Sequence, residues 1–74
     1  MNEEELQQAQ GVIDKIAIGD RLCLAEIYRE EWASIRDPKN FGKRFKKAVF
    51  AKKLNNIIHV GIRNSGRCDE YKRI

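Results

Sequence analysis

The sequence lacks the features that mark membrane, secreted and metal-binding proteins. No apolar run approaches the roughly 20 residues that a membrane-spanning helix needs. No basic region followed by an apolar stretch indicates a secretory signal. Two cysteines and one histidine are widely spaced, whereas a structural zinc site takes four clustered ligands. We therefore expect a cytoplasmic protein with no membrane association, no bound metal and no other cofactor.

Catalytic motifs are also missing. The sequence has no Ser/His/Asp or Cys/His combination in a motif context, and no glycine-rich loop that would hold a phosphate. Its 74 residues form one domain, residues 1–74, which is too small for a deep substrate pocket. His59 has no metal-type partner nearby in the sequence, and we expect it to be structural. We predict that the protein is not an enzyme.

The two cysteines, Cys23 and Cys68, leave two interpretations open. A free cysteine behaves as a small apolar residue, and cytoplasmic proteins rarely keep disulfides. We therefore favour two core residues with free thiols. A disulfide that links two strands is the alternative.

The chain is rich in charged residues, and the sign of the net charge changes between its two halves. Residues 1–37 carry nine acidic and four basic side chains, which gives a net charge of −5. Residues 38–74 carry eleven basic and two acidic side chains, which gives a net charge of +9. A folded molecule with this division has a dipole whose positive end attracts polyanions. The division indicates a class of partner and does not identify one.

The N-terminal half predicts a helix, a short strand and a second helix. Asn2 followed by three glutamates is typical of a helix start, and Gly19-Asp20 is typical of a helix end. Between them, apolar residues recur at three- and four-residue spacing at Leu6, Ala9, Ile13 and Ile16. Residues 21–24 alternate as a strand does, and residues 25–36 return to helical spacing. Pro38 interrupts this second helical pattern.

The C-terminal half predicts a third helix and a β-hairpin. We expect Asn40 to cap the helix, whose buried face holds Phe41, Phe45, Ala48 and Val49. At about 100° per residue, the opposite face is cationic and holds Lys39, Lys43, Lys46, Lys47 and Lys53. The orientation of Phe50 stays open. Residues 57–63 predict a strand with Ile58, Val60 and Ile62 on one face, and residues 67–74 a partner strand after a turn.

This order of elements predicts an α+β fold. Three helices with a small antiparallel sheet that ends in a β-hairpin is the winged helix-turn-helix arrangement. In that arrangement the third helix enters the major groove of DNA and the hairpin forms the wing. The chain carries its positive charge on those two elements. The agreement of topology with charge is the main argument for this fold.

The stretch from Gly19 to Tyr71 also resembles a known family. The matching parts are Gly19-Asp20 with Leu22 and Leu24, Glu26-Ile27-Tyr28, Trp32 with Ile35, Asn40-Phe41-Gly42-Lys43 with Phe45-Lys46 and Val49, Val60-Gly61, and Asn64-Ser65 before Tyr71. The family is a set of short, uncharacterised bacterial and phage proteins, grouped as a domain of unknown function, with a winged-helix pattern. Gly66-Arg67-Cys68 departs from that pattern, which usually has polar residues there. The resemblance implies the fold and no particular activity.

Duplex DNA is the partner that the basic elements favour. On the third helix, Lys39, Lys43, Lys46 and Lys47 would contact phosphates, and Asn40, Lys43 and Arg44 would reach base edges. On the hairpin, Arg63 and Arg67 flank Asn64 and would enter a minor groove. The alternative for each set is a solvated charged surface without a ligand. The favoured function is that of a transcriptional regulator or accessory factor of bacterial or phage origin.

A different class of function also fits the sequence. Winged helices bind other proteins as well as DNA, and the acidic first half exceeds what DNA binding needs. The alternative prediction is therefore a protein–protein interaction module with no nucleic-acid role. The DNA-binding hypothesis in turn predicts a homodimer through the N-terminal helix, with Leu6, Ala9 and Ile13 as its contact residues, because recognition of a specific operator needs more surface than one copy offers. RNA binding is less favoured, because no aromatic-rich exposed strand is visible for base stacking.

Overall fold

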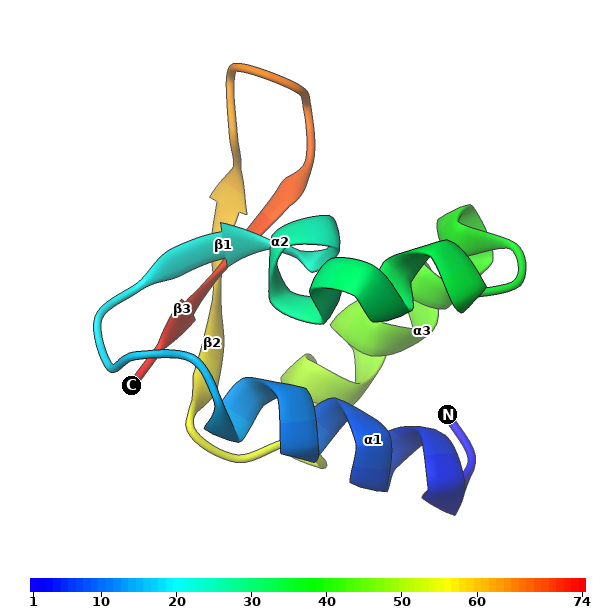
Figure 1. The fold of residues 1–74 in the computed structure, drawn as a ribbon. Helices are drawn as coiled ribbons and strands as arrows, with labels where there is room; N and C mark the ends of the chain where they lie inside the picture. Colours follow the sequence, from blue (N-terminus) through cyan, green and yellow to red (C-terminus); the bar gives the residue numbers. More distant parts are fainter.

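The computed structural model describes residues 1–74 and confirms the α+β class. In chain order the elements are α1 (Glu3–Asp14), β1 (Arg21–Cys23), α2 (Leu24–Tyr28), the 3₁₀ helix η1 (Arg29–Ser34), α3 (Pro38–Phe50), β2 (Ile57–Ile62) and β3 (Asp69–Arg73). The loop between β2 and β3 projects away from the helices, and α1 lies at the opposite end of the molecule (Figure 1). None of the helices is long and apolar enough to span a bilayer.

The start of α1 is as predicted, but its end is not. The Asn2 side chain accepts a hydrogen bond from the Glu5 N–H at 2.8 Å, and the Glu5 carboxylate accepts one from the Asn2 N–H at 3.1 Å. The helix ends at Asp14 and does not continue to Gly19. Gly19 has a positive φ of 96° and donates its N–H to the Arg73 carbonyl at 2.7 Å. The glycine therefore turns the chain into the sheet, five residues after the helix has ended.

The predicted helix over 25–36 is divided in two. Arg29 has a positive φ of 54°, which ends α2 and begins the tighter turns of η1. Trp32 from η1 and Ile35 beyond it are partly buried and pack against the core as the spacing predicts. A single continuous helix was therefore a wrong prediction, although its buried residues are confirmed.

The helix α3 begins two residues before the predicted cap. Pro38 occupies the first turn, where its missing N–H leaves no bond unmade, and Asp37 precedes it with a positive φ of 50°. Asn40 lies inside the helix and donates a side-chain hydrogen bond to the Asp37 carboxylate, so its role as N-cap was a wrong prediction. Phe50 is exposed, with its ring 5.4 Å from that of His59. The buried face is confirmed as Phe41, Phe45, Ala48 and Val49.

The sheet has β3 at its centre. Strands β1 and β2 each pair antiparallel with it, which gives the order β1-β3-β2. A bulge in β2 changes the register, so that Ile58 lies opposite Lys72 but Ile62 lies opposite Asp69. Lys72 and Asp69 are three residues apart on β3 and therefore lie on opposite faces. Ile58, Val60 and Ile62 are all exposed, so burial alternates along β2 as predicted, while the bulge shifts the pairing with β3 beyond His59.

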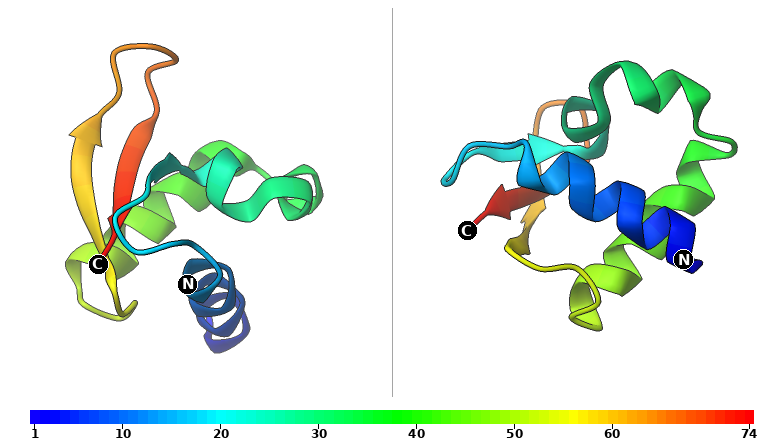
Figure 2. Two further views of the ribbon diagram at one scale, coloured as in Figure 1. Left: turned by 60° about the vertical axis from the view of Figure 1, so that its left-hand side comes forward. Right: turned by 60° about the horizontal axis from the view of Figure 1, so that its bottom comes forward.

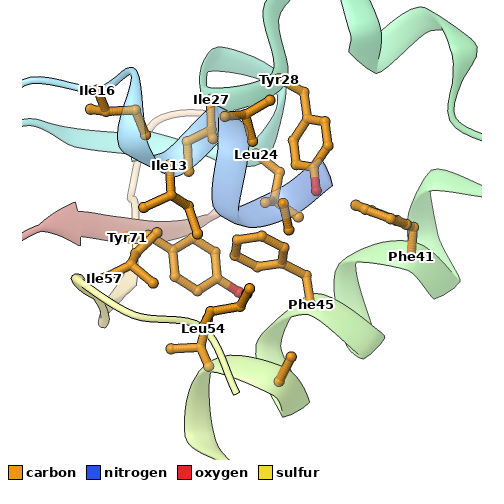
Figure 3. Close-up of a cluster of buried hydrophobic side chains, with 14 residues drawn as sticks. Ile13, Ile16, Leu24, Ile27, Tyr28, Phe41, Phe45, Leu54, Ile57 and Tyr71 are labelled. Carbon is orange, nitrogen blue, oxygen red and sulfur yellow. The ribbon is translucent and has the colours of Figure 1, made fainter. Parts of the chain in front are cut away.

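The core lies between the sheet and the helices and contains a chain of aromatic contacts. The rings of Phe45 and Tyr71 are 5.0 Å apart, and Tyr28 lies 5.3 Å from Phe41, with both pairs edge to face (Figure 3). The hydroxyls of the two tyrosines are buried without a hydrogen-bond partner, and burial raises the pKa of both phenols. Helix α3 is thus anchored to the sheet and to α2 by apolar contacts.

A disulfide joins Cys23 and Cys68, which corrects the favoured prediction of free thiols. Cys23 ends β1, and Cys68 directly precedes β3. Because β1 and β3 are neighbours in the sheet, the two Cα atoms lie 6.0 Å apart, within the range that a disulfide spans. The sequence separation of 45 residues gave no sign of this proximity.

Candidate functional site

A groove of about 530 Å³ lies between α3 and the loop that joins β2 to β3. Its basic side chains are Lys39, Lys43 and Lys46 from α3 and Arg67 from the loop. We term this feature, defined by these four residues, the cationic groove. The rest of its lining consists of Leu24, Ala25, Trp32, Pro38, Gly42, Asp69 and the Cys23–Cys68 disulfide. The left view in Figure 2 shows the loop standing out from the helical part of the molecule.

The helical period explains why the lysines gather there. With Phe41 and Phe45 turned into the core, residues at about 100° steps place Lys39, Lys43 and Lys46 on one side of α3. Lys47 is exposed on the adjoining surface of the helix and does not line the groove. The predicted cationic face therefore exists along α3, but Lys53 lies beyond the end of the helix.

Gly42 forms part of the groove and has no packing reason to be glycine. A Cβ atom added there would meet only Leu24 Cδ1, at an ordinary contact distance of 3.7 Å. The residue lies in the interior of α3, where glycine is unfavourable relative to alanine by about 1 kcal/mol. The missing side chain keeps the helix backbone accessible from within the groove.

Two of the predicted base-reading residues point elsewhere. Arg44 lies 3.4 Å from the Glu5 carboxylate on α1, and its guanidinium sits 5.7 Å from the centre of the Phe41 ring. Asn40 is exposed and bonded to Asp37. Neither side chain lines the groove. Arg44 thus links α3 to α1 and lies on a different side of the helix from the groove lysines.

Arg63 is held at the base of the hairpin by carboxylates. Its guanidinium lies 3.0 Å from Glu70 and 2.9 Å from Glu26, and it donates a further hydrogen bond to the Arg21 carbonyl at 3.3 Å. The hydrogen bond with Glu70 raises the pKa of Arg63, and Glu26 adds to this effect. The Cys23 N–H, and then Arg63, lower the pKa of Glu26. Arg63 therefore ties the hairpin to β1 and α2, and its charge is compensated within the molecule.

Arg67 differs from Arg63 in having no carboxylate partner. Gly66 and Arg67 have positive φ values of 89° and 47°, which form the turn at the end of the loop. The Arg63 N–H donates to the Cys68 carbonyl at 2.8 Å and closes the loop below that turn. Arg67 is exposed and lines the groove, whereas Asn64 is exposed at the tip and does not.

The groove also contains a carboxylate, Asp69, that was not among the predicted site residues. Asp69 Oδ1 lies 3.3 Å from Lys46 Nζ and 2.9 Å from His59 Nε2. Burial raises the pKa of Asp69, but the hydrogen bonds from His59 and Lys46 outweigh this effect, so the pKa lies below its ordinary value. Only the pairing of β2 with β3 brings His59 and Asp69 together, so their spacing in the sequence does not indicate the contact.

The surfaces outside the groove offer less chemistry. A smaller hollow of about 320 Å³ lies between α1 and η1, and its charged residues are of both signs: Lys15, Arg29, Glu30 and Glu31. The predicted dimer contact on α1 is mostly occupied, because Ala9 and Ile13 are fully buried in the core of the same chain.

No protein-family model, curated protein or solved structure matches this chain. The resemblance over Gly19 to Tyr71 therefore stays a prediction. The arguments about function rest on the groove and on the order of the elements.

Proposed function

We propose that this is a winged-helix protein that binds duplex DNA through the cationic groove, as a transcriptional regulator or accessory factor. The observation that carries the proposal is the convergence of three α3 lysines with Arg67, more than twenty residues further along the chain, on one groove. The strand order β1-β3-β2 and the projecting loop support the winged-helix assignment. In such a fold α3 would enter the major groove and the loop would lie against the adjacent backbone.

Phosphate neutralisation supplies most of the affinity in this mechanism. Four cations in or beside the groove have no carboxylate within ion-pair distance: Lys39, Lys43, Lys47 and Arg67. Each phosphate that a cation neutralises adds about −0.9 to the slope of log affinity against log salt. We therefore expect a slope of about −3.6. The excess negative charge of residues 1–37 would orient the molecule so that the groove approaches the DNA.

The decisive comparison is between two pairs of charge reversals. Lys43→Glu with Lys47→Glu changes one lysine of the cationic groove and one beside it on α3, while Lys52→Glu with Lys53→Glu makes the same change in charge just beyond the helix. All four lysines are exposed, so both variants should fold. Fluorescence anisotropy with a labelled 20-base-pair duplex at 50 and 200 mM salt is the measurement.

The reversals at Lys43 and Lys47 should lower the affinity at least tenfold at low salt and reduce the slope by about 1.8, since two phosphate contacts are lost. The matched pair should change the affinity less than threefold and leave the slope unchanged. Equal losses in both variants would indicate a general effect of net charge and would contradict the assignment to the groove.

A protein partner is the second candidate, and the exposed acidic residues of η1 favour it. Glu30 and Glu31 are solvent-exposed and have no basic partner within ion-pair distance. They could pair with the cationic groove of a second copy or of another protein. Sedimentation velocity without DNA discriminates the two: association that weakens with salt supports the protein partner, and a single monomeric species at low salt excludes self-association.

A further inference from the structure

The groove contains one carboxylate among its basic side chains, and that residue is Asp69. Its Oδ1 atom contacts Lys46 Nζ at 3.3 Å from one side and His59 Nε2 at 2.9 Å from the other. The side chains of Asp69 and Lys46 are each 37% exposed, so a ligand in the groove can reach both. A phosphate that approaches Lys46 therefore meets a negative charge already in place.

His59 holds this carboxylate where it is. The histidine ring lies between those of Phe50, at 5.4 Å, and Tyr71, at 5.3 Å, and its side chain is only 13% exposed. Because Tyr71 belongs to the core, the ring has little freedom to move. Asp69 thus keeps one hydrogen-bond partner when Lys46 turns toward a ligand, and it stays at the side of the groove.

We propose that Asp69 is an internal competitor that limits the affinity of the cationic groove for phosphate. In the free protein it occupies the anion position at Lys46, and this ion pair must break before Lys46 contacts a phosphodiester. Asp69 then determines affinity without contributing a contact of its own. This inference rests on the proposed function, because it concerns binding of the DNA backbone in the same groove.

The test is a substitution that should improve binding. Asp69→Asn removes the charge while an amide oxygen remains to accept hydrogen bonds from Lys46 and His59. Asp14→Asn is the matched control: Asp14 is exposed on α1, accepts a hydrogen bond from Gln10 at 3.0 Å, and lies away from the groove. Both variants raise the net charge by one, so any difference between them reports on position.

We expect Asp69→Asn to bind the 20-base-pair duplex about five- to tenfold more tightly at 50 mM salt, with a slope steeper by about 0.9. Asp14→Asn should change the affinity less than twofold. An unfolded basic chain can also bind DNA through its charge, so thermal unfolding of both variants is measured to show that each is folded.

Adding Lys46→Met to each background completes the test. In the wild type this substitution leaves Asp69 unpaired, so the affinity should fall while the salt slope stays unchanged, because Lys46 contacts no phosphate there. In Asp69→Asn it should reduce the slope by about 0.9 and abolish the gain. Equal changes of slope in the two backgrounds, or equal affinities of Asp69→Asn and Asp14→Asn, would overturn the inference while the proposed function stands. If the wild type itself does not bind the duplex, the proposed function fails and the inference fails with it.

Discussion

The two walls of the cationic groove are held in place by different kinds of interaction. The α3 wall is fixed from behind by four buried side chains, Phe41, Phe45, Ala48 and Val49. The hairpin wall, which carries Arg67, has no buried apolar residue between positions 58 and 70. It depends on the disulfide, on the ion pairs of Arg63 and on the backbone hydrogen bond between residues 63 and 68.

Because of this difference, the stability of the α3 wall and the position of the hairpin wall should respond to different changes. Apolar burial is non-directional and distributed over many contacts, so the α3 wall should be insensitive to pH and reductant. The hairpin wall depends on the disulfide and on the ion pairs of Arg63, each of which a substitution can remove singly. Changes that act on one wall only should therefore distinguish the two.

Removing the disulfide should have the largest effect. Replacing both Cys23 and Cys68 by Ser opens a loop of 45 residues, and restoring that chain entropy to the unfolded state costs about 2–4 kcal/mol of stability. Urea unfolding with and without dithiothreitol measures this change. The double variant should resemble the reduced wild type and should not respond to reductant. Two titratable thiols in the non-reduced wild type would contradict the disulfide.

Acid should weaken the hairpin wall by a smaller amount. The pKa values of Glu26 and Asp69 lie below their ordinary values of 4.5 and 3.8, so their contribution to stability is complete above those values. It is lost as the pH falls through the lower pKa values of the folded protein. Amide exchange at pH 6, 4 and 2.5 should show protection lost first between residues 62 and 70. Glu26→Gln with Asp69→Asn should show a weaker dependence on pH, and equal loss along α3 would contradict the comparison.

The smallest expected effect concerns the α3 wall and is an increase in stability, whereas the two changes above lower it. Gly42→Ala and Gly11→Ala should each stabilise the protein by about 0.5–1 kcal/mol, since both glycines lie within helices and both sites accept a Cβ atom. Gly11 lies on α1, outside the groove. Only Gly42→Ala should lower the affinity for the duplex. Equal affinities of the two variants, measured by anisotropy, would show that the bare backbone at Gly42 has no part in binding.

The features that depend on local periodicity could be predicted from the sequence. The buried face of α3 follows from three- and four-residue spacing, and the start of α1 follows from Asn2 before three glutamates. The alternating residues after position 56 predicted the hairpin. Each of these is set by residues within a few positions of one another.

The ion pairs and the disulfide that distinguish the two walls could not be predicted in the same way. Arg63 and Arg67 look equivalent in the sequence, and only the closeness of Glu26 and Glu70 separates their roles. The disulfide and the pairing of Asp69 with Lys46 likewise join residues that β-sheet formation brings together. The division at Arg29 depends on a backbone conformation that nothing in its neighbours indicates.

The disulfide has one more consequence, which concerns the connectivity of the backbone. Cys23 and Cys68 delimit a covalent ring that contains α2, η1, α3 and β2, while α1 and β3 lie on its two tails. The exposed lysines at 52 and 53, in the turn after α3, offer a protease a cleavage site inside that ring. A single cut there would leave both pieces in one molecule, and they would separate only when a reductant opened the sulfur–sulfur bond.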